Sequence, residues 1–174
     1  MKFIQQKIKG VYLIKLEEKK DIRGSFYRLF CKKKLILKKL NSNFVQISNS
    51  CNLKKGTIRG MHYQKKPFQE DKIISCIKGS IYDVLIDIRP KSRTYLKWLG
   101  FTLSENDKKM LYIPKGIAHG FQTLKNDTII NYMMSAFYNK KYSRGIRYDD
   151  KSIQVKWPLK CSLISKQDKN WPEL

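Results

Sequence analysis

The sequence predicts an all-β domain, either a sandwich or a barrel built from many short strands. Short apolar segments rich in β-branched and aromatic residues recur along the chain. Turn residues separate them at intervals of roughly 8–12 residues, a spacing typical of sandwiches and barrels. Few segments show the 3.6-residue apolar period of a helix. These three observations together favour an all-β fold.

The individual elements follow from the same pattern, taken in chain order. Strands are expected over residues 10–16, 25–30, 44–48, 57–63, 72–77, 80–88, 96–103, 110–113, 118–123 and 128–136. Turns are expected at residues 21–24, 54–56, 78–79 and 89–92. Residues 32–40 are the best candidate for a helix, because their leucines form a rough apolar face. In residues 80–88, Asp83 and Asp87 alternate with apolar residues, which predicts a half-buried strand.

The length and composition predict a single domain over residues 1–174. Hydrophobic residues make up 41% and charged residues 29% of the chain, which is ordinary globular composition. There is no internal repeat, low-complexity stretch or Pro/Gly/Ser linker that would divide the 174 residues. No apolar run approaches the roughly 18 residues of a membrane-spanning helix. Lysines interrupt the apolar N-terminal stretch and no small-residue cleavage site follows, so a secretory signal is not expected.

The four cysteines are widely scattered and form no CxxC pair. This spacing argues against a zinc ribbon or a redox motif. With no export signal expected, the cysteines are predicted to be free thiols in a reducing cytoplasm.

The formal net charge of +23 leaves two interpretations open. The excess is mostly lysine, spread over the whole length, and no RNP, zinc-finger or basic-zipper pattern accompanies it. A nucleic-acid-binding function is therefore the least favoured hypothesis. The lysines form either a solvated surface or a basic field that attracts an anionic small molecule such as a nucleotide diphosphate.

The two histidines are the residues most suited to chemistry near neutral pH. Each lies near a glycine in a predicted strand, in the segments Gly60-Met61-His62 and Ala118-His119-Gly120. Residues 114–119 have the P-x-G-x-x-H spacing of cupins, which are double-stranded β-helix barrels. Metal cupins pair this motif with an upstream H-x-H, but here Gln64 occupies the place of the second histidine. Two histidines without a matched carboxylate do not make a convincing metal site, so a metal-free pocket is the better hypothesis.

A metal-free pocket with two histidines suits proton transfer. A histidine base needs a carboxylate to fix its tautomer and to stabilise the imidazolium. Inversion of a carbon centre also needs a proton donor on the opposite face. Tyr132 is a plausible donor, because it lies on a predicted strand shortly after His119. Whether these side chains meet in space does not follow from the pattern.

A set of motifs in a fixed order resembles the dTDP-4-dehydrorhamnose 3,5-epimerases, and it runs across essentially the whole chain. The motifs are Asp21-x-Arg23-Gly24-x-Phe26, Phe44-Val45-Gln46, residues 56–64 (GTIRGMHYQ), Gly79-x-Ile81-Tyr82-Asp83-Val84, Asp87-Ile88-Arg89, Ser92-x-Thr94, Ile113-Pro114-x-Gly116-x-Ala118-His119-Gly120-Phe121, Trp157-Pro158 and Ser165-x-x-Asp168. Each motif alone is weak, whereas the ordered set is highly specific.

The resemblance implies a jelly-roll cupin barrel with short peripheral helices, a homodimer, and no metal or organic cofactor. It implies a cytoplasmic isomerase of dTDP-rhamnose and O-antigen biosynthesis that acts on a nucleotide-linked sugar, with no nucleic-acid or membrane partner. It assigns His62 as the base, Asp168 as its partner and Tyr132 as the general acid. Its substrate-contacting positions are Arg23, Gln46, Ser48, Asn49, Arg59, Lys72, His119 and Tyr138, with Tyr138 stacking on the nucleotide base.

Two departures from the family pattern concern substrate contacts. A family glutamate two residues beyond the phenylalanine of the Arg-Gly-x-Phe motif is Arg28 here, and another appears as Ser143, followed by Arg144. The leading hypothesis is an epimerase that inverts C3, C5 or both of a nucleoside-diphosphate 4-keto-6-deoxyhexose, such as dTDP-4-dehydro-6-deoxyglucose. The alternatives are a single-site epimerase or keto-isomerase on another nucleotide sugar, such as a CDP-linked one, and a non-catalytic nucleotide-sugar-binding cupin.

Overall fold

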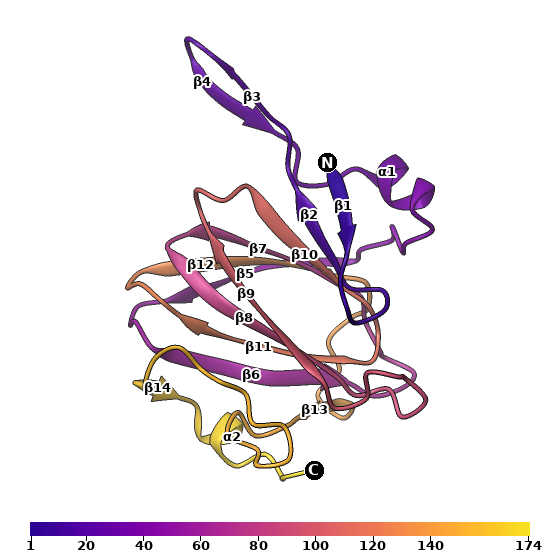
Figure 1. Cartoon of the computed structure of the whole chain (residues 1–174), viewed down its shortest axis with the longest axis vertical. Helices are drawn as coiled ribbons and strands as arrows, with labels where there is room; N and C mark the ends of the chain where they lie inside the picture. The colour runs from indigo at the N-terminus through magenta and orange to yellow at the C-terminus, as the bar shows by residue number, and fades with distance from the viewer.

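The computed structural model describes all 174 residues and consists mainly of two β-sheets around a common interior (Figure 1). The first sheet has the order β1 (Lys2–Gln5), β2 (Tyr12–Lys15), β10 (Lys109–Ile113), β7 (Lys72–Lys78), β12 (Thr128–Met134), β5 (Gln46–Asn52). The second has the order β13 (Ser143–Gly145), β6 (Thr57–Gln64), β11 (Ile117–Thr123), β8 (Ser80–Asp87), β9 (Trp98–Ser104), and β14 (Leu163–Ile164) also pairs with β6. The predicted all-β cupin-like fold is therefore confirmed.

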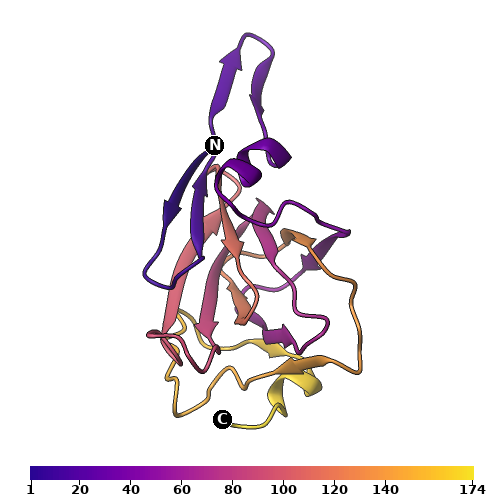
Figure 2. The same ribbon diagram turned by 90° about the vertical axis from the view of Figure 1, so that its right-hand side faces the viewer.

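The remaining elements are peripheral. β3 (Glu18–Asp21) and β4 (Gly24–Tyr27) form a separate two-stranded hairpin that projects from the top of the molecule, away from the C-terminus (Figures 1 and 2). The helix α1 (Lys32–Leu37) lies near this hairpin, and α2 (Lys166–Lys169) lies beside the second sheet near the C-terminal end of the chain (Figure 1). No helix is both long enough and apolar enough to span a lipid bilayer.

The main hydrophobic core joins the two sheets. It contains twelve buried residues, including Ile74 and Leu111 from the first sheet and Leu85 and Phe121 from the second. Burial of each such side chain stabilises the fold by roughly 1.5–3 kcal/mol. The inward-facing residues of the strands thus supply the driving force that brings the two sheets together.

Each of the ten predicted strands has a counterpart in the structure, in the predicted order, but several bounds differ. The strand expected at residues 44–48 is shifted to β5, which continues through Ser50 and Asn52 because it pairs along its length with β12. The strand at residues 10–16 shortens to β2, and the strand at 25–30 ends at Tyr27. β1, β3, β13, β14 and α2 were not predicted from the sequence, since each is short. β13 and β14 also pair with β6, which is distant from them in the sequence.

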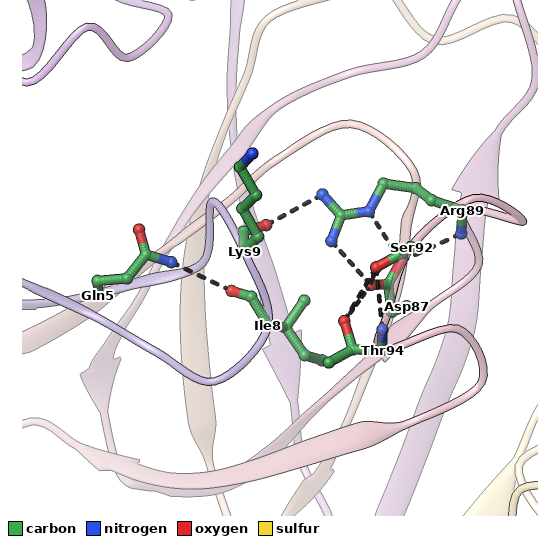
Figure 3. A network of polar contacts seen from close by, with 7 residues as sticks. All are labelled: Gln5, Ile8, Lys9, Asp87, Arg89, Ser92 and Thr94. Atoms are coloured by element: carbon green, nitrogen blue, oxygen red, sulfur yellow. Dashed lines mark hydrogen bonds and ion pairs between the residues drawn. The ribbon is translucent and has the colours of Figure 1, made fainter.

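The prediction of a half-buried strand over residues 80–88 was wrong. Nearly all of β8 is buried, and Asp83 and Asp87 are both fully inaccessible. Polar side chains of the protein take the place of water around both carboxylates. Asp87 binds the Arg89 guanidinium at 2.8 Å and also accepts hydrogen bonds from the hydroxyls of Ser92 and Thr94 (Figure 3).

Two facing glycines allow β6 and β11 to approach closely. A Cβ atom placed on Gly60, whose φ is +134°, would lie 2.5 Å from the Cα of Gly120. The register between the two strands shifts just beyond this point, between His119 and Phe121. As a result, His62 and His119 are directly paired across the two strands. Gly60, two residues before His62, and Gly120, directly after His119, thus allow the strands to approach closely beside the paired histidines.

Candidate active site

A cavity of about 470 Å³ lies between the two sheets. β5, β7 and β12 of the first sheet form one wall, and β6 and β11 of the second sheet form the other. The loop after β12 and the C-terminal segment complete the lining. Eight of the eleven site residues expected from the sequence line this cavity: Gln46, Ser48, Arg59, His62, Lys72, His119, Tyr132 and Tyr138.

His62 and Asp168 form a close pair although 106 residues separate them. The Nε2 atom of His62 lies 2.6 Å from Oδ1 of Asp168, and the backbone N–H of Gly60 donates to Oδ2 at 3.2 Å. Asp168 is delivered by the single-turn helix α2, whose N-cap Ser165 accepts a hydrogen bond from the Asp168 N–H. Asp168 is buried behind the histidine, whereas the His62 side chain remains 40% exposed.

The environment of Asp168 favours its ionised form. Burial acts to raise the pKa of Asp168, but the His62 side chain and hydrogen bonds from Gly60 and Trp171 outweigh it, and the pKa lies below its ordinary value. An ionised Asp168 accepts the Nε2–H of His62. This assignment leaves Nδ1 as the unprotonated ring nitrogen, and no group of the chain hydrogen-bonds to it. Nδ1 is therefore available as a base.

His119 has a carboxylate partner of its own that the sequence pattern did not reveal. Its Nε2 atom lies 2.8 Å from Oδ2 of Asp83, and both side chains are buried. The other carboxylate oxygen of Asp83 has no hydrogen-bond partner. Burial raises the pKa of Asp83, while the facing His119 opposes that shift. This buried pair orients the His119 ring at the back of the cavity.

Tyr132 approaches the cavity from the opposite sheet. It lies on β12, whereas His62 lies on β6, so the two side chains reach the cavity from facing walls. The Tyr132 ring packs edge-on against His119, with the ring centroids 6.0 Å apart. Burial raises the pKa of Tyr132, and the nearby Asp83 carboxylate raises it further. The phenol therefore stays protonated near neutral pH and can donate a proton.

Two cations lie on the walls of the cavity. Arg59 is exposed, and the side-chain oxygen of the buried Asn52 accepts a hydrogen bond from its Nε at 2.8 Å. Lys72 is 3.1 Å from Glu70, and both side chains of this ion pair are largely buried. Gln64 also donates to Glu70, at 3.3 Å. The glutamine that stands in the place of a metal-binding histidine therefore holds a carboxylate that orients Lys72.

The polar rim of the cavity lies on β5 and on the loop after β12. Gln46 accepts a hydrogen bond from the backbone N–H of Tyr138 at 2.7 Å, which links these two segments. Ser48 and Ser50 line the cavity, but Asn49 does not. Because side chains alternate along a strand, Asn49 faces away and bonds to Asn131. Asn49, which the resemblance implied to be a substrate contact, therefore lies outside the lining of this cavity.

The structure places Arg23 outside the cavity. It lies at the tip of the β3–β4 hairpin, where it is highly exposed and pairs with Asp21 at 2.6 Å. Arg28, one of the two departures from the family pattern, follows the same hairpin and is also absent from the cavity lining. Ser143, the other departure, does line the cavity.

Among the residues that sequence reasoning did not assign to this site, Glu70 and Trp171 line the cavity, and Asp83 lies behind it against His119. Asp83 belongs to a motif that was noted, but only the fold shows that it faces His119. Nothing in the sequence indicates that Trp171 lies beside Asp168. No cluster of three or more histidine, cysteine, aspartate or glutamate side chains is arranged to hold a metal ion.

The residues of the cavity are suited to a particular kind of proton transfer. One wall presents a histidine whose free nitrogen can accept a proton, and the facing wall presents a protonated phenol. A ring bound between the walls would meet the base on one face and the acid on the other. Arg59 and Lys72 supply positive charge beside it. This arrangement can invert a carbon centre that bears an acidic C–H bond.

Comparison with known proteins finds the same enzyme description for the matching family model and for the matching relatives. The family model described as dTDP-4-dehydrorhamnose 3,5-epimerase matches residues 5–174. The chain is 37% identical over 175 residues to the dTDP-4-dehydrorhamnose 3,5-epimerase of Sinorhizobium fredii, a match that covers 100% of this chain and 90% of the relative. It is 38% identical to the enzyme of the same name from Shigella flexneri, covering 98% of this chain and 94% of the relative.

Solved structures show the same similarity. The crystal structure of dTDP-4-dehydrorhamnose 3,5-epimerase from Bacillus anthracis, with TDP and PPi bound, has a TM-score of 0.96 and 35% identity, and the match covers 99% of each chain. The Legionella pneumophila enzyme RmlC, in complex with dTDP-4-keto-L-rhamnose, has a TM-score of 0.92 and 32% identity. That match covers 98% of this chain and 90% of the other.

Proposed function

The chain belongs to the dTDP-4-dehydrorhamnose 3,5-epimerase family, and from this premise we propose how its cavity carries out the reaction. The chain is an epimerase that inverts C3, C5 or both of a nucleoside-diphosphate 4-keto-6-deoxyhexose. The substrate that we propose is dTDP-4-dehydro-6-deoxyglucose, and the product is dTDP-4-dehydrorhamnose. The observation that carries the mechanism is the presence of a carboxylate-held histidine and a protonated tyrosine on facing walls.

The C4 ketone makes the hydrogens on C3 and C5 acidic. Nδ1 of His62 removes one of them, the C–H bond breaks, and its electron pair moves onto the ketone oxygen to form an enolate. Asp168 stabilises the imidazolium that results. Tyr132 then donates its proton to the same carbon from the opposite face, and the enolate returns to the ketone. Tyr132 is the donor because its raised pKa keeps the phenol protonated.

The positive charges of the cavity match the charge of such a substrate. Arg59 and Lys72 would offset the negative charge of the diphosphate and of the developing enolate oxygen. Gln46, Ser48 and Tyr138 form the rim, where the nucleoside would lie, with Tyr138 against its base. Tyr138 is 63% exposed without substrate, so it has a free face for stacking.

The place of Arg23 supports the expectation of a homodimer. Arg23 matches a substrate-contacting position, yet it lies on the projecting hairpin and outside its own cavity (Figure 2). We propose that this hairpin reaches the cavity of a second copy. Ile22 and Phe26 on the same hairpin are highly exposed, as expected for side chains that a partner covers. We also place the enzyme in the cytoplasm, where its four free cysteines would remain reduced.

The test is proton exchange with solvent. The protein is incubated with dTDP-4-keto-6-deoxyglucose in deuterium oxide, and NMR measures deuterium at C3 and C5 and the stereochemistry of the product. Deuterium at both carbons with double inversion is the expected result. Exchange at one carbon alone would identify a single-site epimerase. Absence of exchange with dTDP-, CDP- and UDP-linked keto-sugars, together with ligand-induced thermal stabilisation, would show a non-catalytic binding protein.

A further inference from the structure

Trp171 lies directly beside the His62–Asp168 pair. Its indole Nε1–H donates to Oδ1 of Asp168 at 3.2 Å, the same oxygen that His62 approaches at 2.6 Å. This is the only hydrogen bond that the indole makes. The indole ring also packs edge-on against the imidazole, with the ring centroids 6.5 Å apart and an interplanar angle of 73°. Trp171 therefore contacts both members of the pair.

Gly145 and the chain terminus determine where the indole lies. Gly145 is on β13, opposite His62 in the register of β6 and β13. A Cβ atom on Gly145 would lie 2.3 Å from Nε1 and Cε2 of Trp171, so the indole rests on the bare backbone of this glycine. Beyond Trp171, the backbone N–H of Leu174 donates to Asp150 at 2.9 Å and anchors the end of the chain. The contact with Gly145 and the anchored end of the chain thus restrict the position of the indole.

A carboxylate oxygen that accepts two hydrogen bonds attracts each donor proton less strongly than an oxygen that accepts a single bond. The indole N–H shares the charge of Oδ1, so this oxygen attracts the imidazole proton less strongly than it would alone. The same N–H restricts rotation of the carboxylate and keeps Oδ1 directed at His62. Both effects concern the proton-abstraction step, because they determine how His62 is oriented and how readily it stays unprotonated.

We propose that Trp171 is a positioning residue for proton abstraction, whose N–H holds Asp168 in line with His62 and limits the carboxylate's pull on the imidazole. This inference rests on the proposed function of the His62–Asp168 pair. It assigns Trp171 no contact with the reacting atoms. It predicts that loss of the N–H alone, with an aromatic ring retained, alters catalysis.

The variant Trp171→Phe tests this prediction, because it keeps an apolar ring and removes the N–H. We expect kcat to fall about tenfold with KM nearly unchanged, a factor equivalent to one hydrogen bond of ordinary net strength. We also expect the acid limb of the pH–rate profile to move to higher pH, because the released carboxylate stabilises the protonated imidazole. The other titratable groups around the pair remain in place: Arg59, Tyr63, Glu70, Lys72, His119 and Tyr132.

Two further variants separate this role from a structural one. Gly145→Ala leaves Trp171 and the pair unchanged in sequence but displaces the indole, and Gly145 lies outside the positive-φ region, so its backbone tolerates alanine. It should reproduce the loss of kcat and the shifted acid limb. Trp157→Phe is the matched control, since it removes an indole hydrogen bond to the Tyr148 carbonyl away from the cavity. It should leave kcat and the pH profile unchanged.

NMR of the free protein gives a reading that does not depend on activity. The chain has only two histidines, so the Nε2–H signal of His62 can be assigned by comparison with a His119 variant. In Trp171→Phe this signal should move downfield, because Oδ1 then accepts one hydrogen bond instead of two. The inference is overturned if kcat and the pH–rate profile of Trp171→Phe stay at wild-type values. It is also overturned if kcat falls while neither the acid limb of the profile nor the Nε2–H signal of His62 moves. A wild-type protein without exchange activity would refute the proposed function instead, and the NMR shift would still test the hydrogen bond.

Discussion

His62 and His119 are paired across two adjacent strands, yet their surroundings give them different chemistry. The His119 side chain is only 4% exposed and faces a fully buried carboxylate, so it is held at the back of the cavity. The His62 side chain is 40% exposed and leaves one ring nitrogen free toward the cavity. This difference in exposure supports His62 as the proposed base, and the position of Tyr132 on the opposite wall supports it as the proposed acid.

Substitution of the two proposed catalytic residues should separate the two half-steps of the reaction. His62→Ala should abolish solvent deuterium exchange, since no other group of the cavity replaces the base. Tyr132→Phe should retain deuterium exchange but invert the carbon at least about a hundredfold more slowly, within the range of a lost general acid. Deuterium incorporation and product stereochemistry by NMR check both outcomes. Tyr82→Phe is the control, because Tyr82 does not line the cavity, and wild-type turnover by His62→Ala would show that the base is misassigned.

At the scale of elements, α2 shows how one turn of helix positions the carboxylate that pairs with His62. The helix has four residues, and its N-cap Ser165 accepts a hydrogen bond from the backbone N–H of Asp168 at 3.0 Å. A helix this short is not stable by itself, so its cap and its contacts with β6 hold it in place.

Loss of this cap should affect catalysis more than binding. Ser165→Ala removes a contact of about 1 kcal/mol, and we expect kcat to fall about fivefold with KM nearly unchanged. Ser165→Thr retains the hydroxyl and should restore kcat. Steady-state kinetics of the two variants show whether kcat depends on the hydroxyl of the N-cap. Equal kcat values for Ser165→Ala and the wild type would show that Asp168 does not depend on the cap.

A second element-scale feature is the loop between β8 and β9, which is organised around Asp87 (Figure 3). The Arg89 guanidinium binds Asp87 and also donates to the carbonyl of Lys9, which ties this loop to the loop between β1 and β2. Burial acts to raise the pKa of Asp87, but the hydrogen bonds from Arg89, Ser92 and Thr94 lower it to about 2.

The lowered pKa predicts a specific dependence of stability on pH. A carboxyl group whose folded-state pKa is depressed stabilises the fold above its unfolded pKa, and this contribution is lost as the pH falls through the folded value. Asp87→Asn should therefore cost about 2 kcal/mol at pH 7. The difference from wild type should shrink between about pH 4 and pH 2, as measured by denaturant unfolding. Asp149→Asn is the control, because the Arg147–Asp149 pair is exposed and should contribute less than about 1 kcal/mol at any pH.

At the scale of the whole molecule, the projecting hairpin is the element that joins the site to the proposed second copy of the chain. Arg23 lies at the tip of this hairpin and does not line its own cavity, so in our proposal it contacts the substrate in the cavity of the partner. The exposed apolar residues of the hairpin and of α1, among them Phe26 and Leu37, are consistent with an interface there.

Mixed dimers test this arrangement. A heterodimer of Arg23→Ala and His62→Ala chains should have one intact cavity, with His62 from one chain and Arg23 from the other. It should therefore recover about half of the wild-type activity, although each variant homodimer is impaired. Differential tags allow purification of the heterodimer, and sedimentation checks the oligomeric state. No recovery of activity, or a monomer in sedimentation, would contradict the dimeric site.

Much of the fold could be predicted because it depends on local pattern. The alternation of apolar residues indicated most of the strands, and glycine-containing turns indicated where they end. Strands such as β13 and β14 were not predicted, because only two or three residues pair and their partners are distant in the sequence. The burial of Asp83 was missed for a similar reason, since its partner His119 becomes a neighbour only in the folded chain. The burial of Asp87 was missed although Arg89, Ser92 and Thr94 are near it in the sequence, because the local pattern does not show that both faces of β8 are covered.

The sequence by itself determined the fold class, the family and the residue types that carry out the chemistry, because ordered motifs and short apolar periods are local properties of the chain. Only the tertiary structure decided which groups meet. It paired His62 with Asp168 and His119 with Asp83, and it set Tyr132 on the wall facing His62. It also placed Trp171 on Gly145 and excluded Arg23 from the cavity. These relations depend on strand register and on the close approach of glycine backbones, which bring residues together across more than a hundred positions of the chain.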